Sequence, residues 1–400
     1  MLMRGGTSKG AYFLAADLPA EPALRDALLL RIMGGPDPHQ IDGVGGGHPL
    51  TSKVAVVSPS TRPDSDIDYL FLQVAVDRAE VSDRQNCGNI LAGVGAFAVE
   101  RGLVTAGDPE TAVRVRMVNS GDLAAVSFPT PGGRVRYDGD VTIAGVPGSA
   151  APVLIEFPPG AGPLLPTGRV RDVVDGAPVT CVDNGMPTVL VAAASLGVSG
   201  YESPEELEGD TALAGRIRAI RLAAGRLMGL GDVSAATVPK VTLLSPARFG
   251  GTVSTRTFLP VRCHTSIGVL GAASVAVGVG LVGGVGEGVT AERVTAEAAE
   301  GVTLEAAEAV VHHTAPDGPA VRDTSRTGAP GAPGAPGAPA ASPRSAPPTP
   351  TRLRIEHPAG HLDMETTLGT TPEGLLTARR TAVIRTARKI FDGTVFPAPA

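Results

Sequence analysis

Two segments of the chain share one pattern, a short polar stretch followed by small apolar residues at helical spacing. Asn86-Cys87-Gly88-Asn89 precedes the apolar run 90–98, and Cys263-His264-Thr265-Ser266 precedes the run 267–273. A helix that is apolar on every side is normally buried. The repeat therefore predicts two similar halves, each with strands wrapped around one buried, glycine-rich helix.

Short β-like runs account for much of the remaining pattern, separated by clusters of Gly and Pro. We expect strands over 54–57, 69–74, 113–118 and 188–191. Helical periodicity is clear over 21–33, 90–102 and 211–228. The last helix is expected to extend back to 205 and to open after Ser203-Pro204, with Ser203 as the N-cap and Pro204 at position N1.

An uncharged stretch over 266–286 is long enough to cross a bilayer. Seven of its 21 residues are glycine, and those in its second half would make a poor helix. We therefore interpret it as a buried helix followed by a turn.

Domain boundaries follow from a change in composition after about residue 300. The segment 324–350 contains Gly-Ala-Pro four times over 328–339, which predicts a disordered linker without a core. Patterned sequence resumes at Arg352, so the linker is an insertion. We expect an N-terminal lobe from 1–130 and 381–400, and a C-terminal lobe from 131–380 that carries the helix start at 263–276.

Charge and cysteine content limit the classes of partner. A net charge of −6 and a pI near 5.7 argue against nucleic acid and anionic membranes, but leave small anions possible. Three scattered cysteines make a disulfide framework unlikely, and no apolar leader follows Met1. We expect a cytoplasmic protein that acts on a small molecule.

The start of each repeated helix is the first candidate site. Unpaired N–H groups and the positive end of the helix dipole bind anions and favour a thiolate at Cys87. Two such ends facing one cleft would hold a di- or tricarboxylate. The alternative is that Cys87 is an inert, buried structural cysteine.

Two glycine loops could complete this cleft. Lys53 follows Gly45-Gly46-Gly47 at the start of a β run, where a partly buried lysine could serve as a general base, although most lysines are simply solvated. Arg4 lies in Met3-Arg-Gly-Gly-Thr-Ser-Lys-Gly10, a loop suited to carboxylate binding or, alternatively, to a plain tight turn. The turn at 184–187 and Arg256 have about even chances of lining the site.

Other chemistries find little support. The seven histidines show no metal-ligand spacing, and neither a serine-hydrolase elbow nor a nucleotide fingerprint is present. We therefore expect no metal; the absence of a cofactor is an expectation that rests on the resemblance described next.

Several motifs in the same order resemble the PrpF family, and more closely its 4-oxalomesaconate tautomerase branch. Besides the stretch 3–10, they are Gln40-Ile-Asp-Gly43, Thr51-Ser-Lys53, Asn86-Cys-Gly-Asn89, Asp183-Asn-Gly-Met-Pro187, Val238-Pro-Lys240, Cys263-His-Thr-Ser-Ile-Gly268 and Arg385-Thr-Ala-Arg-Lys389. The match covers nearly the whole chain except about 300–350.

The resemblance implies an α+β fold of two pseudo-symmetric, diaminopimelate-epimerase-like lobes, each a barrel-like sheet around a central helix. The final strand, around 383–396, would return to the first lobe. It also implies cofactor-free proton transfer on a small unsaturated keto-tricarboxylate, with Lys53 and Cys87 as catalytic residues. The residues expected to bind substrate are Arg4, Thr7, Ser8, Ser52, Asn86, Gly88, Asn89, Met186, Arg256, His264, Ser266 and Gly268.

Several points stay open at the level of sequence. Cys87 could be the partner acid of Lys53 or a group that positions the substrate. A 2-methylaconitate cis–trans isomerase of the same family, or a non-catalytic carboxylate-binding paralogue, are the alternative functions, and a homodimer is possible.

This chain also departs from the family pattern in two places. Epimerases of this fold use a cysteine at each helix start, whereas Thr265-Ser266 stands at the second start, which disfavours a two-thiol racemase. Relatives carry several residues before the Met-Arg-Gly-Gly motif, so we expect either a start upstream of Met1 or a shortened first strand.

Overall fold

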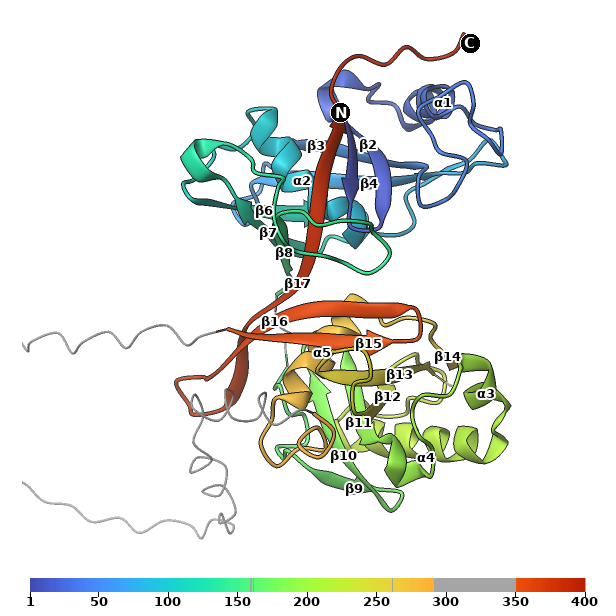
Figure 1. The fold of residues 1–400 in the computed structure, drawn as a ribbon, viewed down its shortest axis with the longest axis vertical. Helices are drawn as coiled ribbons and strands as arrows, with labels where there is room; N and C mark the ends of the chain where they lie inside the picture. Colours follow the sequence, from blue (N-terminus) through green and yellow to red (C-terminus); the bar gives the residue numbers. More distant parts are fainter. Residues whose placement is uncertain (159, 161, 261, 291–349, 400) are drawn as a thin grey trace, which may run out of the picture.

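The computed structural model describes residues 1–158, 160, 162–260, 262–290 and 350–399. Two lobes follow one another along the long axis of the molecule, and each has strands gathered around one helix (Figure 1). The upper lobe surrounds α2 (Gly88–Glu100) and the lower lobe surrounds α5 (Val269–Val279). The stretches 90–98 of α2 and 271–279 of α5 are buried at every position, as the small-residue patterns predicted.

Eight strands of the first lobe close into a ring around α2. In ring order they are β1 (Leu2–Gly5), β2 (Ser8–Leu14), β3 (Lys53–Pro59), β4 (Ile67–Val74), β6 (Glu110–Met117), β7 (Leu123–Pro129), β8 (Pro152–Glu156) and β17 (Leu376–Phe391), which pairs back onto β1. The short β5 (Val81–Ser82) adds to β4. Helix α2 contacts all eight strands, so its start is held by the barrel wall.

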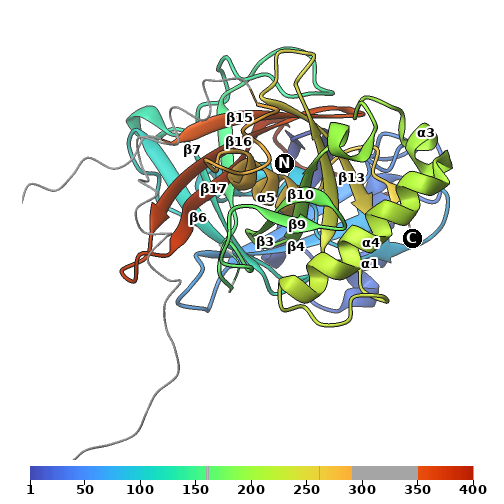
Figure 2. The same ribbon diagram turned by 90° about the horizontal axis from the view of Figure 1, so that it is seen from below.

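The second lobe repeats this order of pairings. Its strands are β9 (Asp172–Val174), β10 (Ala177–Asp183), β11 (Pro187–Ala192), β12 (Lys240–Ser245), β13 (Val253–Leu259), β14 (Arg262–Cys263), β15 (Thr351–His357) and β16 (Gly360–Thr370). From β10 to β17 the pairs are antiparallel, parallel, antiparallel, parallel, antiparallel and antiparallel, as they are from β1 to β8. Viewed from below, α5 lies among β10, β15, β16 and β17 (Figure 2).

Parallel neighbours need a crossover connection, and helices supply it in both lobes. In the first lobe α1 (Pro22–Met33) connects β2 to β3. In the second lobe α3 (Pro204–Gly209) and α4 (Thr211–Leu227) connect β11 to β12. The central helices α2 and α5 stand at equivalent places, before β6 and before β15.

The single helix predicted over 205–228 is wrong, because Asp210 interrupts it. Asp210 has φ −82° and ψ 96°, and its carboxylate accepts a 2.9 Å hydrogen bond from the N–H of Leu213, which caps α4. The predicted N-cap Ser203 is confirmed, and it forms a capping box with Glu206. The capping preference of Asp210 therefore overrides the continuous apolar periodicity.

Strand β17 joins the two lobes. It pairs with β16 in the second lobe, then with β8 and finally with β1 in the first. Arg380 of β17 donates to Glu156 of β8 at 2.6 Å and to Glu365 of β16 at 2.6 Å, so one guanidinium bridges strands from both lobes.

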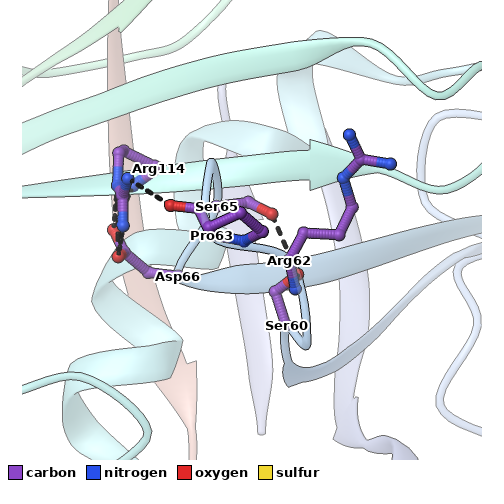
Figure 3. A network of polar contacts seen from close by, with 6 residues as sticks. All are labelled: Ser60, Arg62, Pro63, Ser65, Asp66 and Arg114. Atoms are coloured by element: carbon purple, nitrogen blue, oxygen red, sulfur yellow. Dashed lines mark hydrogen bonds and ion pairs between the residues drawn. The ribbon is translucent and has the colours of Figure 1, made fainter.

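A polar network fixes the register of β4 against its parallel neighbour β6 (Figure 3). The guanidinium of Arg114 binds Asp66 at 2.6 Å and the carbonyl of Pro63 at 3.0 Å. The hydroxyls of Ser60 and Ser65 lie 2.9 Å apart in the same turn. Hydrogen bonds from Arg114 lower the pKa of Asp66, which therefore stays ionised.

Three of the sequence expectations concern the organisation of the chain. The boundary at residue 130 is too early, because β8 pairs with β7 in the first barrel. The Gly/Ala/Pro segment 324–350 lies, except for residue 350, outside the described residues. The interpretation of 266–286 as a buried helix and a turn is confirmed, and no helix within the described ranges is long and apolar enough to cross a membrane.

Candidate active site

Cys87 is the N-cap of α2, with extended backbone angles of φ −134° and ψ 99°. Its side chain makes no capping hydrogen bond, so the N–H groups of the first turn keep their free hydrogen-bonding capacity. A methyl group added at Gly88 would meet no atom within 4 Å, which shows that the space in front of the helix start is open. Cys87 is half-buried, and the positive end of the α2 dipole lies at this open helix start.

The β1–β2 turn packs directly against this helix start. A Cβ on Gly5 would clash with the carbonyl oxygen of Asn89, and one on Gly6 with its side-chain amide. The amide nitrogen of Asn89 donates to the hydroxyl of Thr7 at 2.9 Å. Gly5 and Gly6 are therefore required, because the backbone of the β1–β2 turn is in contact with the start of α2.

Two buried tyrosines anchor the first turn of α2 from below. Tyr69 donates to the carbonyl of Cys87 at 3.2 Å, and Tyr12 donates to that of Ile90 at 2.6 Å. Burial raises the pKa of both phenols well above its usual value, and the nearby Cys87 raises it further. Both tyrosines therefore remain protonated donors, and they fix the position of the thiol.

Lys53 begins β3, paired on one side with Gly10 of β2 and on the other with Gln73 of β4. Its side-chain nitrogen donates to Oε1 of Gln73 at 2.6 Å and lies 5.0 Å from the centre of the Phe71 ring. The residue is 7% exposed, and no described carboxylate forms an ion pair with it. A buried lysine held by a neutral amide is suited to accept and return a proton.

Gln40 holds the loop in front of Lys53. Its side chain donates to the hydroxyl of Ser52 at 2.7 Å and accepts from the N–H of Gly47 at 3.1 Å. Gln40 and Gln73 are therefore functional candidates that sequence reasoning did not name as site residues. The available signal for Gln73 was a single amide in the otherwise apolar end of strand 69–74.

Unpaired buried polar atoms flank the same helix start. Ser8 is 2% exposed and its hydroxyl has no partner among the described residues. Asn86 donates to Ser120 at 2.6 Å, but its own oxygen is buried without a donor. Such atoms are costly to leave unsatisfied, and a bound ligand would satisfy them.

The second lobe presents a comparable start at α5. Gly268 is its N-cap, and a methyl group there would also meet nothing within 4 Å. The N–H of Ser266 donates to Nδ1 of His264 at 2.9 Å, so the ring proton of neutral His264 resides on Nε2. Burial, together with the charge of Lys240, lowers the pKa of His264 and favours this neutral form. Nearby, the carbonyl of Met186 accepts from Ser274 of α5 at 2.7 Å.

A further imidazole, that of His357, lies close enough to His264 to feel its charge, and it was missed at the level of sequence. Burial, followed by the charges of His361, His264 and Arg385, lowers the pKa of His357 to about 4. The Nδ1 atom of His357 and the Nε2 atom of His361 are buried without a partner in the described part of the chain. Pairing of β15 with β16 brings these histidines together, which spacing alone does not indicate.

The two lobes meet close to the β1–β2 turn. A Cβ at Gly360, the first residue of β16, would lie 3.0 Å from that of Ala144. A Cβ at Gly145 would in turn lie 3.5 Å from the methyl group of Thr7. The segment around residue 145 therefore connects the histidine hairpin to the turn that touches α2.

Two arginines from the expected site point elsewhere. Arg256 donates to the carbonyls of Tyr201, Glu202 and Thr255 at 2.8 to 3.1 Å, which are the contacts of a structural residue. Arg4 lines a cavity on the outside of the first barrel, away from Lys53 and Cys87. Alternation along β1 explains this placement, because its buried neighbour Met3 faces the core.

The remaining cysteines are structural in character. Burial raises the pKa of Cys181 to about 12 and that of Cys263 to about 11, so both thiols stay protonated. Cys87 is the cysteine that is not fully buried. Within the described ranges, no group of three or more His, Cys, Asp or Glu side chains is arranged to hold a metal ion.

One known protein family matches most of this chain. The family described as PrpF protein matches residues 1–326. The chain belongs to the PrpF family. This confirms the resemblance seen in the motifs.

Named relatives within the family are similar over much of the chain. The 4-oxalomesaconate tautomerase of Pseudomonas putida KT2440 is 47% identical over 399 residues, which cover 99% of this chain and 94% of the relative. The (4E)-oxalomesaconate Delta-isomerase of Novosphingobium sp. KA1 is 59% identical over 280 residues, 69% of this chain and 78% of the relative. Among solved structures, methylitaconate-delta-isomerase has a TM-score of 0.68 at 29% identity, covering 98% of this chain and 93% of that one. The chain thus has the mixed α/β fold of that isomerase.

Proposed function

We propose that this protein is a cofactor-independent isomerase of 4-oxalomesaconate, which it converts by removing a proton from carbon and returning it elsewhere. The names of the two relatives that are 47% and 59% identical support this substrate. The observation that carries the proposal is Lys53, a buried lysine with no carboxylate partner among the described residues, in the lobe that also presents a thiol at an open helix start.

Lys53 acts as the base in this scheme. Its unprotonated nitrogen takes a proton from the carbon next to the keto group, and the electron pair moves to the carbonyl oxygen as an enolate or dienolate forms. Gln73 accepts one N–H of the amine and so orients its lone pair. The open N–H groups at the start of α2 stabilise the negative charge on oxygen.

Cys87 returns the proton in the second step. Its thiol protonates the oxygen or the far carbon of the dienolate, which gives the tautomer or the allylic isomer. The thiolate left behind lies at the positive end of the α2 dipole. Proton exchange with solvent then restores the neutral amine and the thiol.

The remaining carboxylates of the substrate bind at the start of α5. Neutral His264 offers its Nε2–H, and the residues Ser266 and Gly268 supply the open helix start. In the first lobe Thr7, Ser8, Ser52, Asn86, Gly88 and Asn89 line the other side. Arg256 is left out because each of its three guanidinium nitrogens already donates to a backbone carbonyl.

The repeated order of strand pairings supports the finer assignment of two pseudo-symmetric, diaminopimelate-epimerase-like lobes. In that assignment the cleft between the lobes is the site of reaction. A homodimer and a cytoplasmic location remain predictions, which light scattering and cell fractionation test.

The ultraviolet absorbance of 4-oxalomesaconate tests the function directly. We expect a time-dependent spectral change that is proportional to protein concentration. Binding by calorimetry without any spectral change would instead indicate a non-catalytic carboxylate-binding protein. Conversion of 2-methylaconitate but not of 4-oxalomesaconate would assign the protein to the other isomerase of the family.

A further inference from the structure

A cavity of about 670 Å³ is lined by residues of the paired strands β1 and β17 and by the segment 131–150. Its floor is formed by Arg4 of β1 and Arg388 of β17, which are direct neighbours in the register of these strands. Its walls come from residues 131–150, which include Arg134 and Arg136. Four arginines from three separate segments thus converge on one cavity.

These four guanidinium groups have no acidic partner in the described part of the chain. Lys389, a fifth cation at the cavity, is neutralised by Glu100, to which it donates at 2.5 Å. Tyr137 donates to the same Glu100 at 2.8 Å. The cavity also contains one carboxylate, that of Asp138, which forms no ion pair with any of the arginines.

Such a cluster is unfavourable without a counter-charge. Burial lowers the pKa of Arg4, and the neighbouring charge of Arg388 lowers it further. The chain as a whole carries a net charge of −6, so the cluster is a local excess of positive charge on an acidic protein. Arginine forks in this number are typical of sites that bind carboxylate or phosphate groups.

The cavity is separate from the residues proposed for catalysis. Its lining contains neither Lys53 nor Cys87, and Arg4 is the one expected substrate-binding residue within it. Nη1 of Arg4 is occupied by the carbonyls of Gly6 and Thr386 at 2.9 and 3.0 Å, while Nη2 has no described partner. A guanidinium held in this way is pre-oriented to receive a ligand oxygen on its free side.

We propose that this cavity is a second anion-binding site, which takes a small molecule with two or more carboxylate or phosphate groups. The arginine cluster recognises the charges, and the size of the cavity admits a tricarboxylate or a diphosphate. The site does not depend on the proposed isomerase reaction.

Calorimetric titration with citrate and, separately, with pyrophosphate tests the site. The test protein is a double variant that combines Arg134→Gln with Arg388→Gln. Both side chains are exposed and form no hydrogen bond in the described structure, so the fold should be retained. The matched control is Arg218→Gln, an exposed arginine on α4. We expect the wild type and the control to bind at least one probe, and the double variant to bind it at least tenfold more weakly.

The choice of probe identifies the ligand chemistry, because tighter binding of citrate indicates a carboxylate ligand and tighter binding of pyrophosphate a phosphate ligand. Equal binding by the wild type and the double variant, or no binding of either probe by the wild type, would overturn the proposal. A tenfold rise in KM for 4-oxalomesaconate in the double variant would place the cavity within the substrate site and also overturn it. The titrations remain valid if 4-oxalomesaconate proves not to be the substrate.

Discussion

The side-chain nitrogen of Lys53 donates a 2.6 Å hydrogen bond to Oε1 of Gln73 on the neighbouring strand. Gln73 is held in this orientation because its amide nitrogen donates to the carbonyls of Ser52 at 2.8 Å and Pro49 at 3.1 Å. The lysine is therefore positioned by a neutral acceptor rather than by a carboxylate. A carboxylate at this place would stabilise the ammonium form and remove the base.

Replacement of Gln73 by Glu should therefore inactivate the enzyme near neutral pH. We expect kcat to fall by about two orders of magnitude, the usual lower range for loss of a general base, and to recover partly as pH rises. Gln73→Met, which removes the acceptor without adding charge, should cost less and leave the pH profile unchanged. The pH dependence of kcat, recorded for both variants, measures these differences. An unaltered profile for Gln73→Glu would exclude Lys53 as the base.

Two glycines near α2 should respond in opposite ways to an added methyl group. Gly5→Ala forces the methyl group into the carbonyl of Asn89, and we expect a loss of about 1 to 3 kcal/mol in the free energy of unfolding. Gly88→Ala meets no atom and lies in a helix, so stability should be equal or higher by up to about 1 kcal/mol. The same methyl group enters the proposed site, so KM should rise. Urea unfolding measures the stability of the two variants, and steady-state kinetics measures their KM. A normal KM for Gly88→Ala would place the substrate elsewhere.

Stability should fall in mildly acidic solution because of His357. Its pKa is about 4 in the folded protein and 6.5 in the unfolded chain, so between these values the unfolded state binds a proton that the folded state does not. Stability from this group is therefore complete above pH 6.5 and is lost as pH falls toward 4. We expect a loss of about 1 to 2 kcal/mol, less than the full shift implies because the ring is partly exposed.

His357→Gln is the matched variant for this effect. The decrease in unfolding free energy from pH 7.5 to pH 5 should be smaller in the variant than in the wild type. Equal decreases in the two proteins would show that His357 is not held neutral by its surroundings.

Local patterns in the sequence were sufficient to predict the parts of the fold that depend on neighbours along the chain. The buried helices α2 and α5 follow from runs of small apolar residues, and Ser203 was recognised as a cap. The break at Asp210 was missed because the apolar spacing continues through it, while its capping bond depends on one side-chain rotamer. The place of β8 in the first barrel was missed because it depends on pairing with β7 and with the distant β17.

The candidate site likewise contains residues that the sequence identifies and residues that only the three-dimensional structure identifies. Cys87, Asn89 and Lys53 stand in contiguous motifs and could be named from the sequence. The groups that hold them, such as Tyr69 and Gln73, come from another strand, and strand register decides which of their side chains reach the site. Arg256 is the opposite case, a residue named from the sequence whose contacts in the structure are different. Its guanidinium binds backbone carbonyls, and no sequence pattern reveals these contacts.

The central claim is that Lys53 and Cys87 move a proton on 4-oxalomesaconate. Nuclear magnetic resonance in D₂O follows it most directly, because it reports both conversion and the carbon that gains deuterium. We expect the wild type to isomerise the compound and incorporate deuterium at the new C–H position. Lys53→Gln and Cys87→Ser, shown to be folded by their urea unfolding curves, should do so at least about a hundredfold more slowly. Wild-type rates of exchange and isomerisation in folded Lys53→Gln would contradict the account.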